Sequence, residues 1–218
     1  MIIKFPKTPS LFSSKIPSIF TYSRQISWTL LSLLPICYFF IDKPVALYFE
    51  HISTATSEIF TFFTHLIAPS YYFFVLPPMY FIVRFIRKKK KAGDRVLFLL
   101  GAVSMSNMIV ELLKLFFARP RPEEFFEQHI YRIGFFHAHQ GSYSFPSGHA
   151  CTAAAVMTCF SYFFPKYSIP LFIFGAFLAC SRIVLTVHFV SDVLGGLLVG
   201  FILTQYMHKI LKEEHLHL

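Results

Sequence analysis

Six apolar segments separated by polar or charged residues constrain the fold of this chain more than any other feature. They cover approximately residues 26–41, 59–86, 96–117, 148–164, 169–185 and 189–207. A helix needs about 20 predominantly apolar residues to cross the hydrocarbon core of a bilayer. Only 14% of the residues are charged, against about a quarter in a soluble domain. We therefore predict an all-α polytopic membrane protein with six transmembrane helices in one bundle.

The segmentation predicts a single membrane domain, residues 26–211, between short tails at 1–25 and 212–218. Pro35 lies inside the first segment, and Pro69, Pro77 and Pro78 lie inside the second, where we expect a kink. The segment 42–58 is mildly amphipathic, which is compatible with a helix that lies along the interface.

Basic residues lie between the apolar segments and predict the orientation. The formal net charge is +9, and the densest basic run is RFIRKKKKAGDR at residues 84–95. Cytoplasmic loops of membrane proteins carry an excess of Lys and Arg. With this run and the basic N-terminal tail inside, six spans place both termini in the cytoplasm and residues 118–147 outside. No recognisable nucleic-acid-binding module accompanies the charge, so we predict no nucleic-acid partner.

Charged and polar side chains recur at the ends of three apolar segments that share the outer side. They are Lys114, Arg121, Ser147, His149, Arg182, His188 and Asp192. Ionisable residues close to the hydrocarbon core are costly and usually mark a functional site. Their convergence at one depth predicts such a site on the outer face.

The PSGH stretch at residues 146–149 has the features of an anion site. Ser147 is a good N-cap, and the free N–H groups of the first helical turn attract an anion. Gly148 lets a ligand approach the backbone, and His149 would stand beside that ligand. The three cations of the constellation suit a phosphate group with its spread negative charge.

The last two segments supply a histidine and a carboxylate. His188 and Asp192 are four residues apart, so on a helix they share a face. The carboxylate can then hold one ring nitrogen of the imidazole and leave the other free as nucleophile or base. Arg182 and His188 would lie about 240° apart on one continuous helix. We therefore expect a bend between the fifth and sixth spans.

These residues together resemble the type 2 phosphatidic acid phosphatase superfamily. Six residues separate Lys114 from the Arg121–Pro122 pair, PSGH follows at 146–149, and Ser181–Arg182 precedes His188 and Asp192. The blocks are complete and in order. The resemblance covers residues 114–192 by motif and most of the chain by its six-span layout.

The resemblance implies a metal-independent phosphatase without a cofactor that forms a phosphohistidine intermediate. It implies His188 as nucleophile, Asp192 as its orienting partner and His149 as general acid. The implied phosphate cradle is Lys114, Arg121, Ser147, Gly148 and Arg182. Bacterial members act on lipid phosphates of the inner membrane, which implies a lipid A, undecaprenyl diphosphate or glycerophospholipid phosphate substrate and a periplasmic site.

Two other functions remain open from the sequence. A lipid phosphotransferase would share the first step, because the phosphohistidine could pass its phosphoryl group to another lipid. A non-catalytic transporter would use the charges as an anion path, but transporters place such groups near the bilayer midplane. The sequence does not distinguish among the candidate lipids or oligomeric states.

Several residues near the motifs have competing interpretations. Arg119 either touches the substrate or reaches to the membrane interface, Glu111 is expected to pair with Lys114, and Asn107 is expected to form an interhelical hydrogen bond. The aromatic 118–147 connection is either an interfacial belt or a lid over the headgroup. His137 and His139 in it are too few for a metal site on their own, so we predict no metal.

Overall fold

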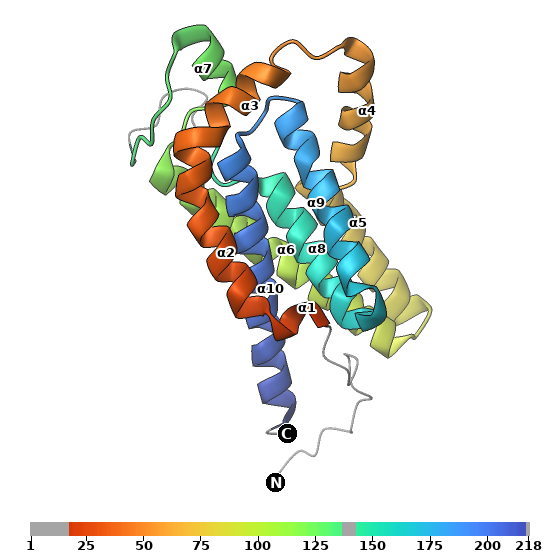
Figure 1. Cartoon of the computed structure of the whole chain (residues 1–218). Coiled ribbons are helices and arrows are strands. Elements are labelled where there is room, and N and C mark those ends of the chain that lie inside the picture. The colour runs from red at the N-terminus through yellow and green to blue at the C-terminus, as the bar shows by residue number, and fades with distance from the viewer. Residues whose placement is uncertain (1–17, 137–142, 217–218) are drawn as a thin grey trace.

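The computed structural model describes residues 18–136 and 143–216, and every regular element in these two ranges is helical (Figure 1). The α-helices are α1 (Ser18–Thr21), α2 (Ser23–Ile36), α3 (Asp42–Phe49), α4 (Thr54–His65), α5 (Pro69–Phe81), α6 (Lys90–Phe117), α7 (Pro122–Gln128), α8 (Gly148–Phe163), α9 (Ser168–Val184) and α10 (Val190–Leu216). Two π-helical turns, η1 (Cys37–Ile41) and η2 (Ile82–Ile86), follow α2 and α5, and a 3₁₀ turn, η3 (Pro165–Tyr167), precedes α9. The predicted all-α class is thus confirmed for the described residues.

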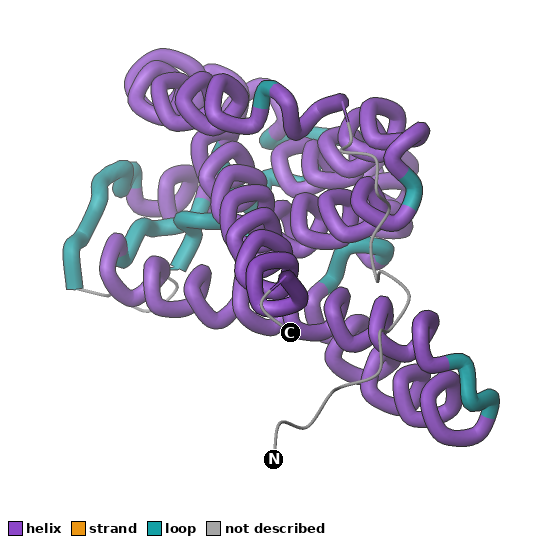
Figure 2. Tube along the Cα trace, turned by 90° about the horizontal axis from the view of Figure 1, so that it is seen from below, coloured by secondary structure: helices purple, strands orange, loops and turns teal. Residues whose placement is uncertain are grey.

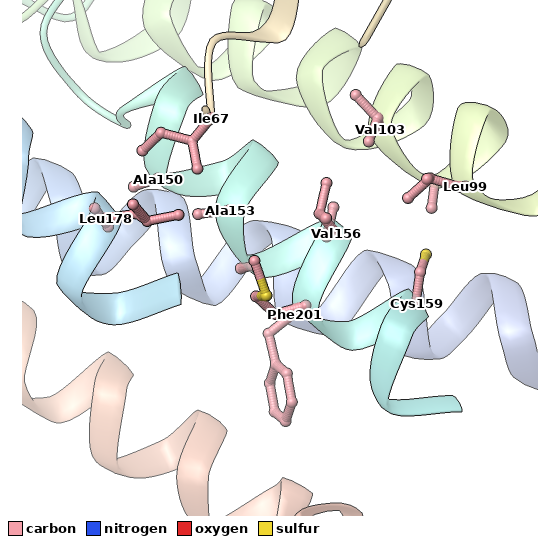
Figure 3. Packing of buried hydrophobic residues seen from close by; sticks show 14 of the residues in the cluster. Ile67, Leu99, Val103, Ala150, Ala153, Val156, Cys159, Leu178 and Phe201 are labelled. Carbon is pink, nitrogen blue, oxygen red and sulfur yellow. The ribbon is translucent and has the colours of Figure 1, made fainter. Parts of the chain in front are cut away.

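Helix α8 is the centre of the bundle and packs against α6, α9 and α10. Fourteen of its sixteen residues are buried. Figure 3 shows the small side chains of Ala150, Ala153 and Val156 facing residues from the surrounding helices. Because α8 is rich in alanine, its neighbours approach closely and hold the residues at its N-terminus, which are predicted to bind phosphate, in a packed frame.

The contact between α8 and α10 is the closest in the bundle. A Cβ atom placed on Gly196 would clash with the carbonyl oxygen of Ser147, and one on Gly200 with that of Cys151. Only glycine leaves room for this approach. The two glycines are four residues apart, the spacing of a small-residue helix–helix contact in membranes. They fix the start of α8 against the start of α10, where the predicted site residues lie.

Within the described residues, five helical segments are long and apolar enough to cross a membrane. They are Ser23–Phe49, Thr54–Ile86, Lys90–Gln128, Pro165–Val184 and Val190–Glu213. The apolar windows of the first two are only 17% buried within the protein, so their side chains are available to lipid. The fourth predicted span, 148–164, corresponds to α8, which is shorter than these five. The count of six therefore stays a prediction.

The N-terminal half differs from the predicted segmentation. The first span does not end at residue 41, because helical structure continues from α2 through η1 into α3. Asp42 consequently lies within this helical segment and is 1% exposed. The second predicted span is two helices, α4 and α5, because Pro69 begins a new helix at its first position. The basic run is mostly helical, with only residues 87–89 between η2 and α6.

Both ends of the bundle are visible in Figure 1. Helix α7 and the turn from α9 to α10 lie at one end, which we call the site end. Helix α1, the turn from η2 to α6 and the C-terminal part of α10 lie at the other, the far end. In the view from below, Figure 2, α10 extends past the other helices toward the viewer. The basic run and the predicted phosphate site thus occupy opposite ends.

Candidate active site

The turn between α9 and α10 brings His188 back toward Arg182. The backbone N–H groups of Val187 and His188 both donate to the carbonyl oxygen of Arg182, at 3.1 and 3.2 Å. Helix α9 ends at Val184 and α10 begins at Val190. The bend predicted from the six-residue separation is thereby confirmed.

His188 and Asp192 form a buried pair at the start of α10. The exposed fractions of the two residues are 4% and 0%. The Nδ1 atom of His188 lies 3.7 Å from Oδ2 of Asp192 and 3.4 Å from Oγ of Ser144. Ser144 Oγ also donates to Asp192 Oδ2, and the backbone N–H of Phe189 donates to the same oxygen at 2.8 Å. Because Nδ1 faces this group, Nε2 is the ring nitrogen left for chemistry.

The N-terminus of α8 lies against this pair. The side chain of Ser147 caps the helix by accepting from the N–H of Ala150, at 3.5 Å. The N–H of Ser147 donates to the carbonyl oxygen of Asp192 at 3.0 Å. A Cβ on Gly148 would come within 3.9 Å of Lys114 Nζ, so this glycine keeps the space beside the ammonium group open. The N-cap predicted at Ser147 is confirmed, whereas its contact with phosphate stays a prediction.

Three cations surround His149 and His188. His149 interacts electrostatically with Arg182, His188, Lys114 and Arg121. His188 in turn interacts with Arg182 and Arg121. The guanidinium of Arg182 is oriented by Thr64 of α4, whose hydroxyl accepts from Nη1 at 3.1 Å. The predicted site residues therefore come together from α6, α7, α8, α9 and α10, in a group able to hold a multiply charged anion.

Two further predicted contacts on α6 are present. Lys114 Nζ lies 2.7 Å from a carboxylate oxygen of Glu111, which is itself exposed. Nδ2 of Asn107 donates to Thr152 Oγ1 of α8 at 2.9 Å. Both expectations are confirmed. The second bond fixes the rotation of α6 against α8 and so the direction in which Lys114 leaves its helix.

The imidazole of His188 is neutral over most of the pH range. Burial lowers the pKa of His188 to about 4; Asp192 opposes this shift, and Arg182 and Arg121 reinforce it. A neutral imidazole has a free lone pair and can act as a nucleophile. Burial therefore keeps His188 in the neutral form that a nucleophilic histidine needs.

A cavity of about 330 Å³ opens beside the site. Its lining comes from the ends of α3 and α7 and from the α9–α10 turn: Glu50, Arg121, Glu123, Phe126, Glu127, Leu185, Thr186 and Val187. Arg121 is the one predicted site residue that lines this cavity, so the cavity adjoins the group of cations. Its size is at the lower end of the range for small-molecule pockets.

Both interpretations of Arg119 are wrong. Its side chain is 2% exposed, which excludes an interfacial position. Nη1 donates to Asp192 Oδ1 at 2.6 Å, and Nη2 donates to Asp42 Oδ2 at 2.8 Å. Arg119 thus contacts the oxygen of Asp192 that does not face His188.

The 118–147 connection is only partly described. Helix α7 follows Arg121, and the backbone N–H groups of Gly134 and Phe135 donate to the carbonyl oxygen of Phe117. His137 and His139 lie outside the described residues, so the interpretation of them stays a prediction. Across residues 20–136 and 143–213, whose side chains the structure describes, no three His, Cys, Asp or Glu side chains group as metal ligands would.

Sequence reasoning missed several residues of the site. Ser144, Ser191 and Thr64 carry short polar side chains that give no signal among the many hydroxyl residues of the chain. Asp42 did carry a signal, because it follows directly on the apolar stretch CYFFI, and an acidic residue there is costly unless it is paired. Its partner lies 77 residues away, which no local pattern reveals.

Comparisons with known proteins agree with this geometry. The sequence model of the PAP2 superfamily matches residues 95–215. The lipid A 1-phosphatase of Rhizobium johnstonii is 32% identical over 103 residues, which make up 47% of this chain and only 42% of that protein. Phosphatidylglycerophosphatase B of Bacillus subtilis is 32% identical over 159 residues, covering 67% of this chain and 71% of that protein.

The fold is also that of a solved membrane phosphatase. The crystal structure described as the first transmembrane PAP2 type phosphatidylglycerolphosphate phosphatase, from Bacillus subtilis, superposes with a TM-score of 0.60. The superposition covers 90% of this chain and 95% of that one, at 23% sequence identity. The matched family region contains Lys114, Arg121, the PSGH stretch, Arg182, His188 and Asp192. This chain is an integral membrane protein and belongs to the PAP2 superfamily.

Proposed function

We propose that this protein is a lipid phosphate phosphatase that removes a phosphate group from a membrane lipid through a phosphohistidine intermediate. The observation that carries the proposal is the buried His188–Asp192 pair beside three cations and the N-terminus of α8. The phosphatase names of the relatives support the same reaction class. Because the matched region spans less than half of the lipid A 1-phosphatase, that relative's substrate is a hypothesis here.

In the proposed mechanism, the phosphate is held by Lys114, Arg121 and Arg182 and by the first N–H groups of α8. Nε2 of His188 attacks phosphorus, and the bond from phosphorus to the lipid oxygen breaks. The charge that develops on the phosphoryl oxygens meets fixed cations where little water competes, which is the largest expected contribution to the rate. Asp192 stabilises the positive charge that develops on the imidazole.

His149 is the proposed general acid. It lies among the same cations, and bound phosphate would offset their effect on its protonation. The proton passes to the leaving lipid oxygen. A water molecule then attacks the phosphohistidine, breaks the P–N bond and releases inorganic phosphate, with His149 receiving the proton from that water.

We propose that the protein has six transmembrane spans, of which α8 is the shortest. Sixteen residues extend about 24 Å at 1.5 Å per residue, and α8 is buried among other helices along most of its length. The basic residues at the far end favour a cytoplasmic position for that end and both termini. The site then faces the periplasm of a bacterial inner membrane. A fluorescent protein fused after residue 218 should fluoresce, and a periplasmic reporter fused there should be inactive.

The activity is tested on purified protein in detergent. Phosphate release is measured from lipid A, undecaprenyl diphosphate, phosphatidylglycerol phosphate and phosphatidic acid, with EDTA present and His188→Ala as control. Release from one lipid that is lost in the variant supports the proposal and names the substrate. Strong inhibition by EDTA that a divalent ion reverses would contradict a metal-independent reaction.

Two other outcomes would change the assignment. Lipid dephosphorylation without free phosphate, together with phosphate on a second lipid, would identify a phosphotransferase that uses the same histidine. No reaction with any lipid, in a protein that is folded and monodisperse, would favour the non-catalytic alternative.

A further inference from the structure

A second layer of charge lies directly behind the His188–Asp192 pair. Arg119 forms ion pairs with two carboxylates, Asp192 at 2.6 Å and Asp42 at 2.8 Å. All three side chains are at most 2% exposed. We call Asp42, Arg119 and Asp192 the support triad.

The support triad joins three separate parts of the chain. Asp42 begins α3, Arg119 follows α6, and Asp192 lies in the first turn of α10. Ser191 ties the first and last together, since its backbone N–H donates to Asp42 Oδ1 at 2.9 Å and its hydroxyl donates to Asp42 Oδ2. It also accepts from Arg119 Nη1 at 2.7 Å. Asp42 lies outside residues 95–215, the region of the family match.

Three aromatic rings enclose the guanidinium of Arg119. Its central carbon lies 4.4 Å from the ring centre of Phe189, 4.9 Å from that of Tyr38 and 5.1 Å from that of Tyr131. The hydroxyl of Tyr131 donates to Asp42 Oδ2 at 3.1 Å. Burial raises the pKa of Tyr131, so this hydroxyl keeps its proton. The rings surround the guanidinium and shield it from water, in keeping with its 2% exposure.

Stability alone does not account for this arrangement. Removing charges from water costs several kcal/mol per ion, and a buried ion pair is often no more stabilising than apolar side chains of similar volume. The planar guanidinium of Arg119, in contrast, donates from Nη1 to Asp192 and from Nη2 to Asp42, and so fixes the position of one oxygen of each carboxylate. Arg119 engages Oδ1 of Asp192 and leaves Oδ2 to face His188 Nδ1. The consequence is a defined orientation at the catalytic pair.

We propose that Asp42 and Arg119 are positioning residues for the phosphatase reaction, which hold Asp192 in the orientation and charge state that His188 requires. The proposal rests on the proposed function of His188. Two carboxylates and one guanidinium carry one net negative charge. Arg119 prevents two uncompensated carboxylates from lying side by side, and Asp42 prevents Arg119 from neutralising Asp192 completely.

Removing the charge of Asp42 and removing the charge of Arg119 should shift the pKa of His188 in opposite directions. Groups on other elements also face His188: Arg182 on α9, Arg121 before α7 and His149 on α8. These groups are unchanged in variants of Asp42 and Arg119. Asp42→Asn makes the triad neutral and should lower the pKa of His188, whereas Arg119→Gln gives it two negative charges and should raise that pKa.

The experiment is a double-mutant cycle of wild type, Asp42→Asn, Arg119→Gln and the double variant. The first readout is the titration of the ¹⁵N-histidine NMR signal of His188, assigned by its loss in His188→Gln. The expected shifts are about one pH unit, downward in Asp42→Asn and upward in Arg119→Gln. The double variant restores one net negative charge and should titrate close to wild type.

The second readout is steady-state kinetics on the lipid found to be a substrate. Asp42→Asn should lower kcat about tenfold and Arg119→Gln about 100-fold, with KM within about twofold, since the triad acts on the chemical step. The double variant should be more active than Arg119→Gln alone. If Arg119→Gln does not fold, Asp42→Asn and the double variant still test the sign of the shift and the recovery.

A matched double-mutant cycle at the far end shows whether loss of any ion pair, and not of this one in particular, changes the His188 titration or kcat. Arg84 and Asp94 are 3.5 Å apart there, and Arg84→Gln, Asp94→Asn and their double variant should leave the His188 titration and kcat unchanged. Additive losses of kcat in the support triad, with no shift of the His188 titration, would overturn the proposal. Because the titration needs no substrate, shifts of the expected sign without any turnover would instead contradict the phosphatase assignment.

Discussion

The two ends of the bundle use the same arginine–aspartate chemistry in opposite ways. At the far end, Arg84 and Asp94 lie 3.5 Å apart with side chains 30% and 37% exposed. At the site end, Arg119 contacts two aspartates within 2.8 Å, and none of the three is more than 2% exposed. Both ends contain an arginine–aspartate ion pair, so the presence of such a pair does not distinguish them. The difference is burial: the buried network at the site end adjoins the proposed catalytic pair, whereas the exposed pair at the far end lies among the basic residues of a membrane surface.

The physical reason is the cost of desolvation. An exposed pair contributes about 0–1 kcal/mol and can be lost without consequence. A buried pair that loses one partner leaves a charge without compensation, at a cost of about 3–5 kcal/mol. Substitutions at the site end should therefore have large effects on activity or folding, and matched substitutions at the far end should have small ones.

The largest effect is expected from His188→Ala, compared with His208→Ala. His188 is the proposed nucleophile, so its removal should lower kcat by roughly 10⁴-fold or more. His208 stacks on Tyr162 near the far end, with ring centres 3.6 Å apart, and its loss should leave kcat within about twofold. Phosphate release per folded protein measures both. Comparable losses in the two variants would show that the fold, and not the nucleophile, had been damaged.

Arg182→Ala should have the next largest effect. The variant removes a cation from the developing charge of the transition state, which costs about 100- to 1000-fold in kcat when the site excludes water. Thr64→Val keeps the cation and removes only the hydroxyl that orients it at 3.1 Å, so a loss of about tenfold is expected. Kinetics on both variants separate charge from orientation, and an equal effect would contradict the assignment of Arg182 to the cradle.

The pH dependence should reveal the buried state of His188. An exposed histidine with a pKa of about 6.5 is only about one-tenth neutral at pH 5.5, whereas His188, with its pKa of about 4, stays almost wholly neutral there. As pH falls, the nucleophile is lost only below about pH 5. The value of kcat/KM, corrected for ionisation of the substrate, should therefore keep its acid limb near pH 4. An acid limb near pH 6.5 would show that His188 is solvated.

Features that depend on residues close together in the sequence could be predicted, and features that depend on distant pairings could not. The helical class follows from local apolar segments, and the pairing of His188 with Asp192 follows from their four-residue spacing. The bend before His188 could also be derived, because helix geometry alone requires it. These features depend on residues close together in the sequence.

The remainder depends on pairings across long separations. Arg119 could not be placed, because its partners Asp42 and Asp192 are 77 and 73 residues away. The first span was predicted too short for the same reason. A charged residue such as Asp42 is expected to end a membrane span unless its buried partner is known. The count of six spans stays a prediction, because α8 has sixteen residues and is shorter than the five segments long enough to cross a membrane.

A loss of stability is expected from Gly200→Ala. The added Cβ would meet the carbonyl oxygen of Cys151 and press α10 away from α8, so a loss of about 1–3 kcal/mol is expected. Gly101→Ala is the matched control, since its Cβ would meet only the flexible end of Met207. Thermal unfolding in detergent should show a lower Tm for Gly200→Ala and little change for Gly101→Ala. Equal Tm values would mean that the α8–α10 contact is more adaptable than its geometry indicates.

The smallest effect is expected at the far end, from Arg84→Gln. Arg84→Gln breaks the exposed pair with Asp94 and should change the free energy of unfolding by no more than about 0.5 kcal/mol, with kcat unaltered. High salt should make the variant and the wild type indistinguishable, because exposed charges are screened. Thermal unfolding at low and high salt measures this. A large, salt-independent loss would show that the far end also holds an organised charge network, and the distinction between the two ends would then fail.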